Sequence, residues 1–293
     1  MWYFRFRILG LRIKKPLRYK DLILYSPQKY NGYSFLETMR RFKDASGVKQ
    51  KVERLIELLQ IFYLTWITYF GIYRRKNSTE KWEFVEATTT FNIPSEGLHP
   101  LYDEIFLDDF LKLTFNRKRY RDQIFRSNIL LINARLPGML FENKFLLRWI
   151  ALESLMRENK GIWQNYSRNQ FKQIKRYGRQ FAKKIRSEKI RNIFLDKINR
   201  TEGDVKFREA FKKFVTKRHL PVTYDDITDC KKLRDKIVHY GSMRGVIASS
   251  HYNSLSNGLE SLIRNLLAYY LGLKFNRDWK RWWSCSLWPP QKR

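Results

Sequence analysis

The hydrophobic pattern of this chain changes its period once along the sequence, near residues 93–100. Before this point, aromatic and β-branched residues form short runs in which residue types alternate, as in strands. These runs are Trp2–Ile13, Leu22–Tyr25, Tyr63–Tyr73 and Trp82–Phe91. From Asp103 onward, apolar residues recur at the helical period. Because the two patterns are segregated along the chain, the sequence predicts an α+β protein, with a β-rich N-terminal region followed by an all-helical bundle.

The segment Ile93–Pro100 is the expected connector between the two regions. It holds two prolines and one glycine and has no periodicity, which is typical of a loop. We therefore expect a β-rich regulatory or sensing domain over residues 1–100 and a helical domain over 101–293. Within the first domain, the stripe from Val48 to Leu59 predicts a helix, and the polar turn Lys76–Glu80 predicts a hairpin between the last two strands.

Three further helices are predicted in the second domain. Phe141–Arg157 is a mostly apolar run, and one acidic residue, Glu153, lies within its apolar stretch Phe145–Met156. Another helix should open near Thr223 or Asp225, either of which can cap it, and end at Gly241. A Leu-rich helix should begin near Ser254 or Ser256 and end before Gly272.

The charge of the chain predicts a polyanionic partner. Its 293 residues contain 59 Lys and Arg against 28 Asp and Glu, a net charge of +31. Among cytoplasmic polyanions nucleic acid is the commonest, and acidic lipids and proteins are weaker candidates. The two cysteines are too few for a disulfide framework. With no signal-peptide pattern at the start, a cytoplasmic protein is expected.

The positive charge is densest between Arg168 and Arg218, where 18 Lys and Arg stand against five Asp and Glu. Apolar residues at helical spacing lie beneath this charge, which predicts an amphipathic helix with a basic face in an insert over about residues 160–220. An ordinary solvated helix face is the alternative, although mixed signs suit such a face better. The expected RNA contacts are the basic residues at its start: Arg168, Lys172, Lys175, Arg176, Arg179, Lys183 and Lys184.

The run Leu55–Tyr73 is nearly long enough to span a bilayer, but it contains Glu57, Gln60 and Gly71. We therefore expect a helix followed by a strand, with no membrane span. A basic peripheral membrane protein anchored through this run remains an alternative.

Common catalytic motifs are absent from the sequence. It has no P-loop, no dinucleotide-binding glycine pattern, no nucleophile elbow and no HExxH, which argues against NTPases, Rossmann enzymes, serine hydrolases and zincins. The four histidines share no metal-ligand spacing. Asp225 and Asp226 are better explained as helix-start residues than as part of a carboxylate cluster. Neither a metal nor a cofactor is expected.

After these exclusions, the segment Leu233–Gly241, with the sequence LRDKIVHYG, holds the remaining candidate catalytic residues. It places Arg234 beside the polar Asp235 and five residues before His239, near the end of a predicted helix. This arrangement resembles the signature of the HEPN superfamily of ribonucleases. Asn is the commoner family choice after the arginine, and Asp is tolerated.

Two other segments extend the resemblance. Ala151–Leu155 is similar to the first conserved helix of the ApeA-like branch of the family, and Ser254–Leu271 matches its closing helix. The order of helix, variable helical region, motif helix and closing helix covers roughly residues 120–275. The β-rich first half is similar in kind to the N-terminal region of ApeA-like proteins. Arg244 and His251 have an allowed gap as well, but Gly245 follows that arginine.

Arg234 and His239 can together cut RNA without a metal. The 2′-hydroxyl of RNA attacks its own phosphate once its proton is removed, and a neutral or charged imidazole can take up or donate protons near pH 7. A guanidinium stays charged and binds phosphate oxygens in a bidentate manner. We expect Asp235 to orient the arginine, Tyr240 to have a structural or phosphate-bonding role, and Glu153 to reach the motif helix.

Five residues of helix separate Arg234 from His239, so their side chains leave an ideal helix about 140° apart. The resemblance implies that two copies of the helix pair at a two-fold axis, so that the protein is a homodimer. It also implies a role in bacterial antiviral defence or as a toxin.

Other interpretations of these residues stay open. His239 can be a structural histidine at a helix end, and Arg234 a surface ion-pair partner. The protein is then a non-catalytic RNA-binding or scaffold protein that uses a HEPN fold to dimerise. The basic tail with Trp279, Trp282, Trp283 and Trp288 is either a docking flap or a platform for single strands.

Overall fold

A computed structural model describes residues 1–27, 33–87, 106–115, 122–157, 162–163, 168–200, 206–241 and 251–275. Its contacts group the chain into two compact units, one formed by Met1–Leu155 with Asp229–Arg293 and the other by Met156–Thr228. The division thus falls on either side of the expected basic insert, and the expected boundary near residue 100 lies outside the described residues.

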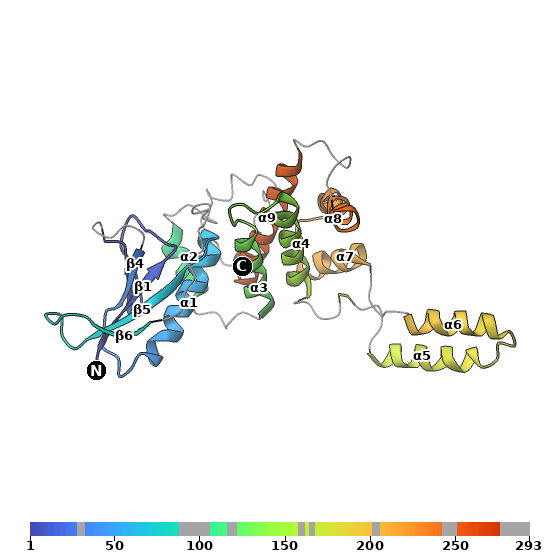
Figure 1. The fold of residues 1–293 in the computed structure, drawn as a ribbon, viewed down its shortest axis with the longest axis horizontal. Helices are drawn as coiled ribbons and strands as arrows, with labels where there is room; N and C mark the ends of the chain where they lie inside the picture. Colours follow the sequence, from blue (N-terminus) through green and yellow to red (C-terminus); the bar gives the residue numbers. More distant parts are fainter. Residues whose placement is uncertain are drawn as a thin grey trace. The chain divides into compact units, whose positions relative to one another are not determined.

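The first unit begins with a six-stranded sheet in which every neighbouring pair is antiparallel (Figure 1). The strand order is β2-β3-β4-β1-β5-β6. A single helix, α1 (Ser46–Tyr63), follows the fourth strand. The strands are β1 (Tyr3–Leu9), β2 (Leu17–Tyr19), β3 (Leu22–Tyr25), β4 (Tyr33–Thr38), β5 (Thr68–Arg75) and β6 (Glu83–Ala87).

One face of the sheet lies against α1, which runs along it in Figure 1. Alternate residues of β1 on this face, Phe4, Phe6 and Ile8, are almost fully buried, as expected for a strand with one face in the core. At the margin, Lys49 Nζ on α1 lies 2.8 Å from Glu86 Oε2 on β6. The alternation in the first strand, which is visible in the sequence, therefore has a direct packing cause.

The predicted hairpin between the last two strands is confirmed, because β5 and β6 pair in antiparallel register. Two predicted bounds differ from the structure. The strand expected from Tyr63 begins at Thr68, because α1 continues to Tyr63 and ends on Leu64 in the left-handed conformation. The first strand ends at Leu9, because Gly10 turns with φ +81° and approaches Trp66 so closely that a Cβ would lie 1.8 Å from the Trp66 carbonyl oxygen.

Helices complete the first unit. They are α2 (Leu107–Thr114), α3 (Asp122–Asn133), α4 (Phe141–Arg157), α8 (Thr228–Tyr240) and α9 (Tyr252–Tyr270). Ser127 on α3 donates to the Ala151 carbonyl of α4 at 3.0 Å, and Tyr270 on α9 donates to the Leu155 carbonyl of α4 at 3.0 Å. The helix predicted over Phe141–Arg157 has the bounds expected for it. A β-rich N-terminus followed by a helical region is the α+β arrangement that the sequence predicts.

The second unit holds α5 (Arg168–Ala182), α6 (Glu188–Arg200), α7 (Phe207–Arg218) and a short 3₁₀ turn at Asp225–Ile227. The single amphipathic helix suggested for the basic stretch is thus three helices within the described residues. Helices α5 and α6 form a hairpin in which Phe181 and Phe194 meet with ring centroids 5.6 Å apart. Ser187 lies directly before α6 and accepts from the Ile190 N–H at 3.5 Å, which favours a helix start there.

The run considered as a membrane segment, Leu55–Tyr73, contributes to the core of the first unit. Leu55, Leu59 and Phe62 on α1 and Ile72 on β5 are nearly inaccessible to solvent. In the part of the chain that the structure describes, no helix combines the length and apolarity needed to cross a membrane. The apolar side chains of α1 in this run are therefore used inside the protein, and the peripheral-membrane alternative stays a prediction.

Candidate active site and basic surface

Helix α8, which carries the predicted motif, begins at Thr228, directly after the 3₁₀ turn Asp225–Ile227. The carboxylate of Asp226 in this turn accepts from the Thr223 N–H at 2.8 Å and from the Thr223 hydroxyl at 3.1 Å. The expected cap by Thr223 or Asp225 is wrong, because Tyr224 is the first flanking residue of the turn and no side chain among the described residues caps it. The Thr223–Asp226 bonds instead close the loop that leads into the turn.

The inner side of α8 is apolar and packs into the first unit. Cys230, Leu233 and Ile237 repeat at helical spacing and are buried. The Cys230 thiol donates to the Leu255 carbonyl of α9 across 3.7 Å. Burial, with a smaller contribution from the charge of Asp229, raises the pKa of the Cys230 thiol to about 12. This cysteine is a packing residue and stays protonated at neutral pH.

Arg234 lies at the margin of the buried side of α8, Asp235 lies on the outer side, and the two half-buried side chains contact each other. Arg234 Nη1 donates to Asp235 Oδ1 at 3.1 Å, and Lys231 forms an ion pair with the same carboxylate. Partial burial raises the pKa of Asp235, but the bonds from Lys231 and Arg234 outweigh it and the pKa is lowered overall. Asp235 is therefore an anion that orients the arginine and does not serve as a proton donor near pH 7.

His239 is exposed in the last turn of α8, where it lies beside Tyr240 with ring centroids 6.4 Å apart. The helix ends on Gly241, whose φ of +63° suits glycine and whose N–H donates to the Ile237 carbonyl at 2.8 Å. Val238 and Tyr240 are 51% and 76% exposed. An imidazole and two large apolar side chains thus reach solvent together at this end of the helix.

Arg234 and His239 belong to one uninterrupted helix, so their side chains leave it in directions about 140° apart. A single copy of α8 cannot aim both at one phosphate in the manner of neighbouring residues on a helix face. The arrangement supplies one oriented cation and one exposed imidazole.

Glu153 lies on α4, where its Oε1 accepts from the Trp149 indole N–H at 2.7 Å. The contact that the structure records for this carboxylate is therefore with its own helix. The expectation that it reaches the motif helix stays a prediction.

A buried charge cluster that the sequence did not predict lies in the same unit. Glu260 on α9 is the acceptor for Arg148 on α4, with Arg148 Nη2 2.7 Å from Glu260 Oε2. Arg135, just after α3, binds the other carboxylate oxygen, and Arg148 also binds the Ser256 hydroxyl. We call these residues, Glu260, Arg135, Arg148 and Ser256, the Glu260 cluster. They join three helical segments through one carboxylate.

The environment of Glu260 is electrostatically unusual. Burial alone raises the pKa of its carboxyl, but the charges of Arg148, Arg135 and Arg264 outweigh burial and lower the pKa to about 2. The cluster is therefore ionised and structural, because a buried charge is tolerated only with partners of this quality. The sequence pattern that could have indicated this cluster is a single acidic residue, Glu260, within the leucine stripe of a helix. Glu153 shows the same pattern.

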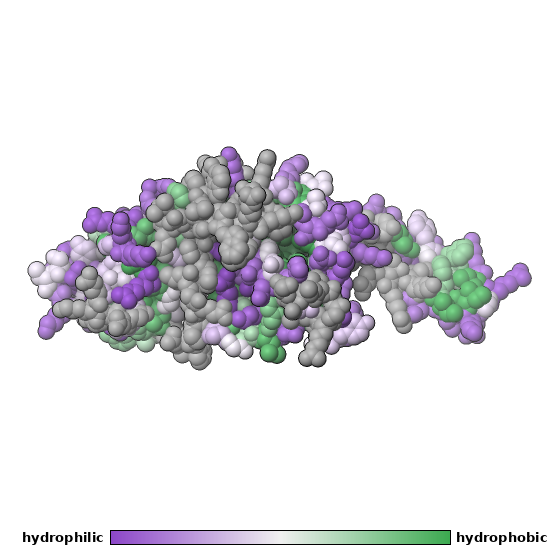
Figure 2. Space-filling model, turned by 90° about the horizontal axis from the view of Figure 1, so that it is seen from above, coloured by the Kyte–Doolittle hydropathy of each residue, from purple (hydrophilic) through white to green (hydrophobic). Residues whose placement is uncertain are grey.

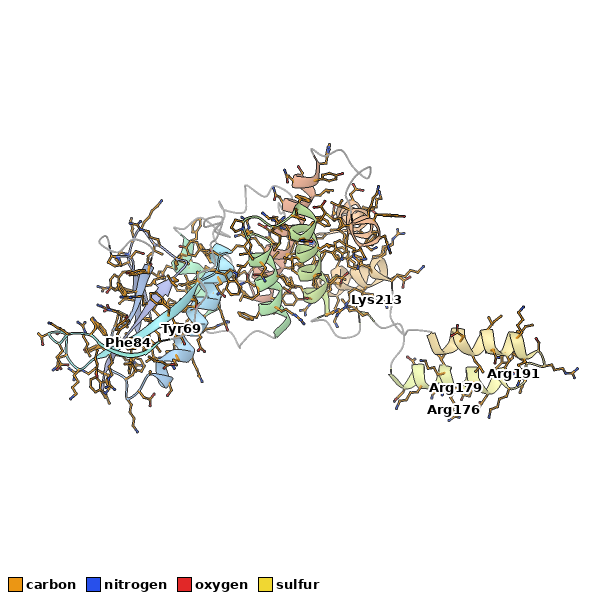
Figure 3. The ribbon with its side chains drawn as sticks, viewed as in Figure 1. Tyr69, Phe84, Arg176, Arg179, Arg191 and Lys213 are labelled. Carbon is orange, nitrogen blue, oxygen red and sulfur yellow. The ribbon has the colours of Figure 1, made fainter. Side chains whose placement is uncertain are left out.

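The basic residues expected to contact RNA lie on α5 and in the turn that follows it. Lys172, Arg176, Arg179, Lys183 and Lys184 are exposed and Lys175 is half-buried; the Arg168 side chain lies outside the described residues. The α5 members recur at intervals of three or four, which places them on one face of the helix. Figure 3 labels Arg176 and Arg179 on α5 together with Arg191 on α6.

The same hairpin also exposes apolar side chains, which are visible as green atoms over α5 and α6 in Figure 2. Tyr177 and Phe181 on α5 and Ile190 and Ile193 on α6 are each more than half exposed. The α5–α6 hairpin thus has a basic face and a partly covered apolar face.

Several expected features fall on parts of the chain outside the described residues. They are the connector Ile93–Pro100, the arginine of the second Arg–His spacing, Arg244, and the Trp-rich tail. Among the residues that are described, no group of three His, Cys, Asp or Glu side chains could hold a metal ion. Neither a protein-family model nor a curated protein nor a solved structure matches the chain.

Proposed function

We propose that the protein is a metal-independent endoribonuclease of HEPN type that acts in the cytoplasm as a homodimer. Arg234 and His239 are its catalytic residues, and the attacking group is the 2′-hydroxyl of the RNA. A role in bacterial antiviral defence or as a toxin follows from the resemblance alone.

The observation that carries this proposal is the two-sided construction of α8. Its inner side is anchored through Cys230, Leu233 and Ile237, so the outer side is held on a rigid element. Asp235 on that outer side orients the Arg234 guanidinium, and His239 reaches solvent at the helix end. A fixed cation beside open solvent is what a phosphate-binding group needs.

The chemistry divides between the two residues. His239 moves a proton, from the 2′-hydroxyl as base or to the leaving 5′-oxygen as acid, because histidine is the commonest side chain for general acid–base catalysis. Arg234 stabilises the additional negative charge on phosphorus in the transition state. The new bond joins the 2′-oxygen to phosphorus and the bond to the 5′-oxygen breaks, leaving a 2′,3′-cyclic phosphate.

The exposed apolar residues beside the imidazole support dimerisation at this helix. Burial of the apolar surface of Val238 and Tyr240 lowers the free energy. A two-fold axis at α8 would bury both residues against a second copy. The same axis would bring His239 of one copy toward Arg234 of the other. The two residues could then act on one phosphate although they leave their own helix about 140° apart.

The basic face of α5 supports RNA as the substrate. Lys172, Arg176 and Arg179 present charges at successive turns, as phosphates of a nucleic-acid backbone require. The same face favours the alternative function, a non-catalytic RNA-binding or scaffold protein, because it can hold RNA whatever α8 does.

The decisive experiment incubates the purified full chain with total RNA in excess EDTA. Cleavage should persist and leave 2′,3′-cyclic phosphate ends, and an oligonucleotide with 2′-deoxyribose at the cut position should resist. RNA that is bound but left intact would favour the scaffold function. Cleavage that EDTA abolishes would instead point to metal-dependent chemistry and remove Arg234 and His239 from their assigned roles.

A further inference from the structure

The face of the sheet that points away from α1 is lined by arginine and aromatic side chains. Register places them together, since Arg5 lies opposite Tyr73 and Tyr3 lies opposite Arg75 across β1 and β5, and directly paired residues share a face. We call this surface the open face. Its members are Tyr3, Arg5 and Arg7 on β1, Tyr33, the buried Phe35 and Glu37 on β4, Phe70, Tyr73 and Arg75 on β5, Trp82 just before β6, and Phe84 on β6.

The open face is distinct from the buried face of the same sheet. Figure 1 draws α1 on one side of the sheet and no described helix on the other. Tyr69, labelled with Phe84 in Figure 3, belongs to the buried face, because its ring meets that of Phe6 with centroids 5.4 Å apart. Phe84 on the open face is 55% exposed.

Guanidinium groups lie over the rings of the open face. The Arg5 guanidinium carbon is 4.2 Å from the centroid of Trp82, and that of Arg75 is 4.3 Å from the same ring. Arg5 also lies 4.9 Å from the Phe35 ring. These are cation–π distances, so the arginines of this face lie against its aromatic rings.

Arg7 occupies the centre of the open face and differs from Arg5 in its partners. Arg5 is neutralised by Glu37, with Nε 2.5 Å from Oε1. The Arg7 guanidinium lies 4.9 Å from Tyr33 and 5.5 Å from Tyr73, and its buried Nε has no hydrogen-bond partner within the described residues. A cation surrounded by rings without a carboxylate is complementary to an anion from outside.

Gly71 allows Tyr73 to lie flat on the sheet beside Arg7. It is the residue opposite Arg7 in the register. A Cβ at this glycine would lie 3.2 Å from Cε2 and 3.4 Å from the hydroxyl oxygen of Tyr73. The missing side chain therefore makes room for the ring, which a strand glycine does where another group approaches closely. Across β5 and β6, the Tyr73 and Phe84 ring centroids are 5.5 Å apart.

This composition suits neither a core nor an ordinary solvated face. The outer face of an antiparallel sheet is usually polar, and a core face is usually apolar. Rings interleaved with arginines are instead what unpaired bases need, because bases stack on aromatic rings and on guanidinium planes while the arginines neutralise phosphates. An acidic protein would satisfy the arginines but would leave the row of rings unexplained.

We infer that the open face binds the unpaired nucleotides of single-stranded RNA. Bases stack on Phe84, Tyr73 and the Arg-covered Trp82, and Arg7 and Arg75 bind the phosphates between them. This site is in the β-rich region and is separate from both α8 and the basic face of α5. It would hold a single strand whether or not the protein cleaves it.

The test measures binding of the full chain to a labelled 2′-O-methyl oligoribonucleotide, because such a strand lacks the free 2′-hydroxyl and resists cleavage. The variants are Phe84→Ala, which removes an exposed ring, and Arg7→Gln. Matched controls are Phe125→Ala, at a residue 41% exposed on α3, and Arg40→Gln, whose guanidinium lies 5.1 Å from the Phe42 ring but is paired with Asp21.

Phe84→Ala should weaken binding of the single strand about 5- to 150-fold, the range for loss of one base stack. Arg7→Gln should weaken it as well and reduce the salt slope by about 0.7. Both variants should bind the corresponding duplex as wild type does, keep the thermal midpoint of unfolding, and differ from their controls. An oligonucleotide containing 5-bromouridine should crosslink under ultraviolet light to the peptide that holds Trp82 and Phe84.

Wild-type affinity of both variants for the single strand would overturn the inference. Equal loss of single-strand and duplex binding would also overturn it, because a duplex offers no unpaired bases. Competition by polyglutamate as effective as that by unlabelled oligonucleotide would assign the face to an acidic protein instead. None of these outcomes depends on cleavage, so the proposed ribonuclease activity can fail while this inference stands.

Discussion

Arg148 on α4 and Glu260 on α9 form an ion pair in the interior of the helical region, with Nη2 of the arginine 2.7 Å from Oε2 of the glutamate. Both side chains are less than 10% exposed. The contribution of such a buried pair to stability becomes measurable when one partner is removed, because the remaining charge then has neither its partner nor water to stabilise it.

Glu260→Ala should lower the free energy of unfolding by about 3–5 kcal/mol, since it leaves Arg148 and Arg135 buried without their anion. Urea denaturation followed by circular dichroism measures this change. The control is Glu83→Ala, which removes an exposed partner of Arg74 and should change stability little. Equal stability of the two variants would show that the Glu260 cluster is not the buried ion pair described here.

Stability should decline in acid because the pKa of Glu260 is lowered from 4.5 to about 2. Below about pH 4.5 the unfolded chain binds this proton while the folded protein does not, so the contribution is complete above that pH and is lost as the pH falls toward 2. The depressed pKa corresponds to about 3 kcal/mol. Denaturation midpoints measured from about pH 6 to pH 3 should fall more steeply for wild type than for Glu260→Gln. Parallel curves for the two proteins would contradict the assignment.

His239→Ala and Arg234→Ala should each reduce RNA cleavage about 10²- to 10⁴-fold, because a proton carrier and a phosphate clamp act mainly in the transition state. Binding of RNA and the thermal midpoint should stay near wild type. His251→Ala, at an exposed histidine before α9, is the matched control and should remain active. Full activity of His239→Ala would remove the proposed mechanism.

The pair of substitutions Val238→Asp and Tyr240→Asp should convert a homodimer into a monomer, because two charges would be buried at the proposed two-fold axis. Sedimentation at micromolar concentration measures the change. Tyr177→Asp, at an exposed aromatic residue on α5, should leave the dimer intact. A wild-type protein that sediments only as a monomer would count against both the dimer and the shared active site.

Changing Lys172, Arg176, Arg179 and Lys183 to Gln should reduce the salt slope of single-stranded RNA binding by about 0.7 for each phosphate that the protein no longer neutralises. The slope comes from affinities measured over a series of salt concentrations. A control with the same reduction in charge changes Arg12, Lys14, Lys15 and Arg18, which are exposed in the first unit. An unchanged slope in the α5 variant would show that these residues form an ordinary solvated helix face and do not bind RNA phosphates.

Local sequence determined the type of most elements in this protein. Leu22–Tyr25 and Phe141–Arg157 were predicted with the bounds that the structure has, because apolar periodicity reports directly which side of an element faces the core. The α+β order follows from the same signal. Strands β2 and β4 were not predicted. Strand β2 has only three residues, and in β4 the three successive residues Ser34, Phe35 and Leu36 are all buried, so the alternation that marks a strand is missing.

The sequence also predicted that Arg234, Asp235 and His239 lie on one helix, and α8 contains all three. Asp235 follows Arg234 directly and His239 comes five residues after it, so helix geometry alone sets the directions of their side chains. The bond between Arg234 and Asp235 is therefore within reach of sequence reasoning. The Glu260 cluster was not, because its two arginines lie more than 100 residues before the glutamate, and no local pattern links them.

The open face shows most clearly which features depend on local sequence and which depend on tertiary structure. The alternation in β1 determined by itself that Tyr3, Arg5 and Arg7 share one side of a strand, because successive side chains point to opposite faces. Only the register decided what lies beside them: Phe35 opposite Arg7 on β4, and Tyr73 opposite Arg5 on β5. A shift of one residue in either pairing would have moved those rings to the opposite face of the sheet. Strand pairing is a long-range choice made by the whole packed unit, so tertiary structure alone turned separate arginines and aromatic residues into one surface.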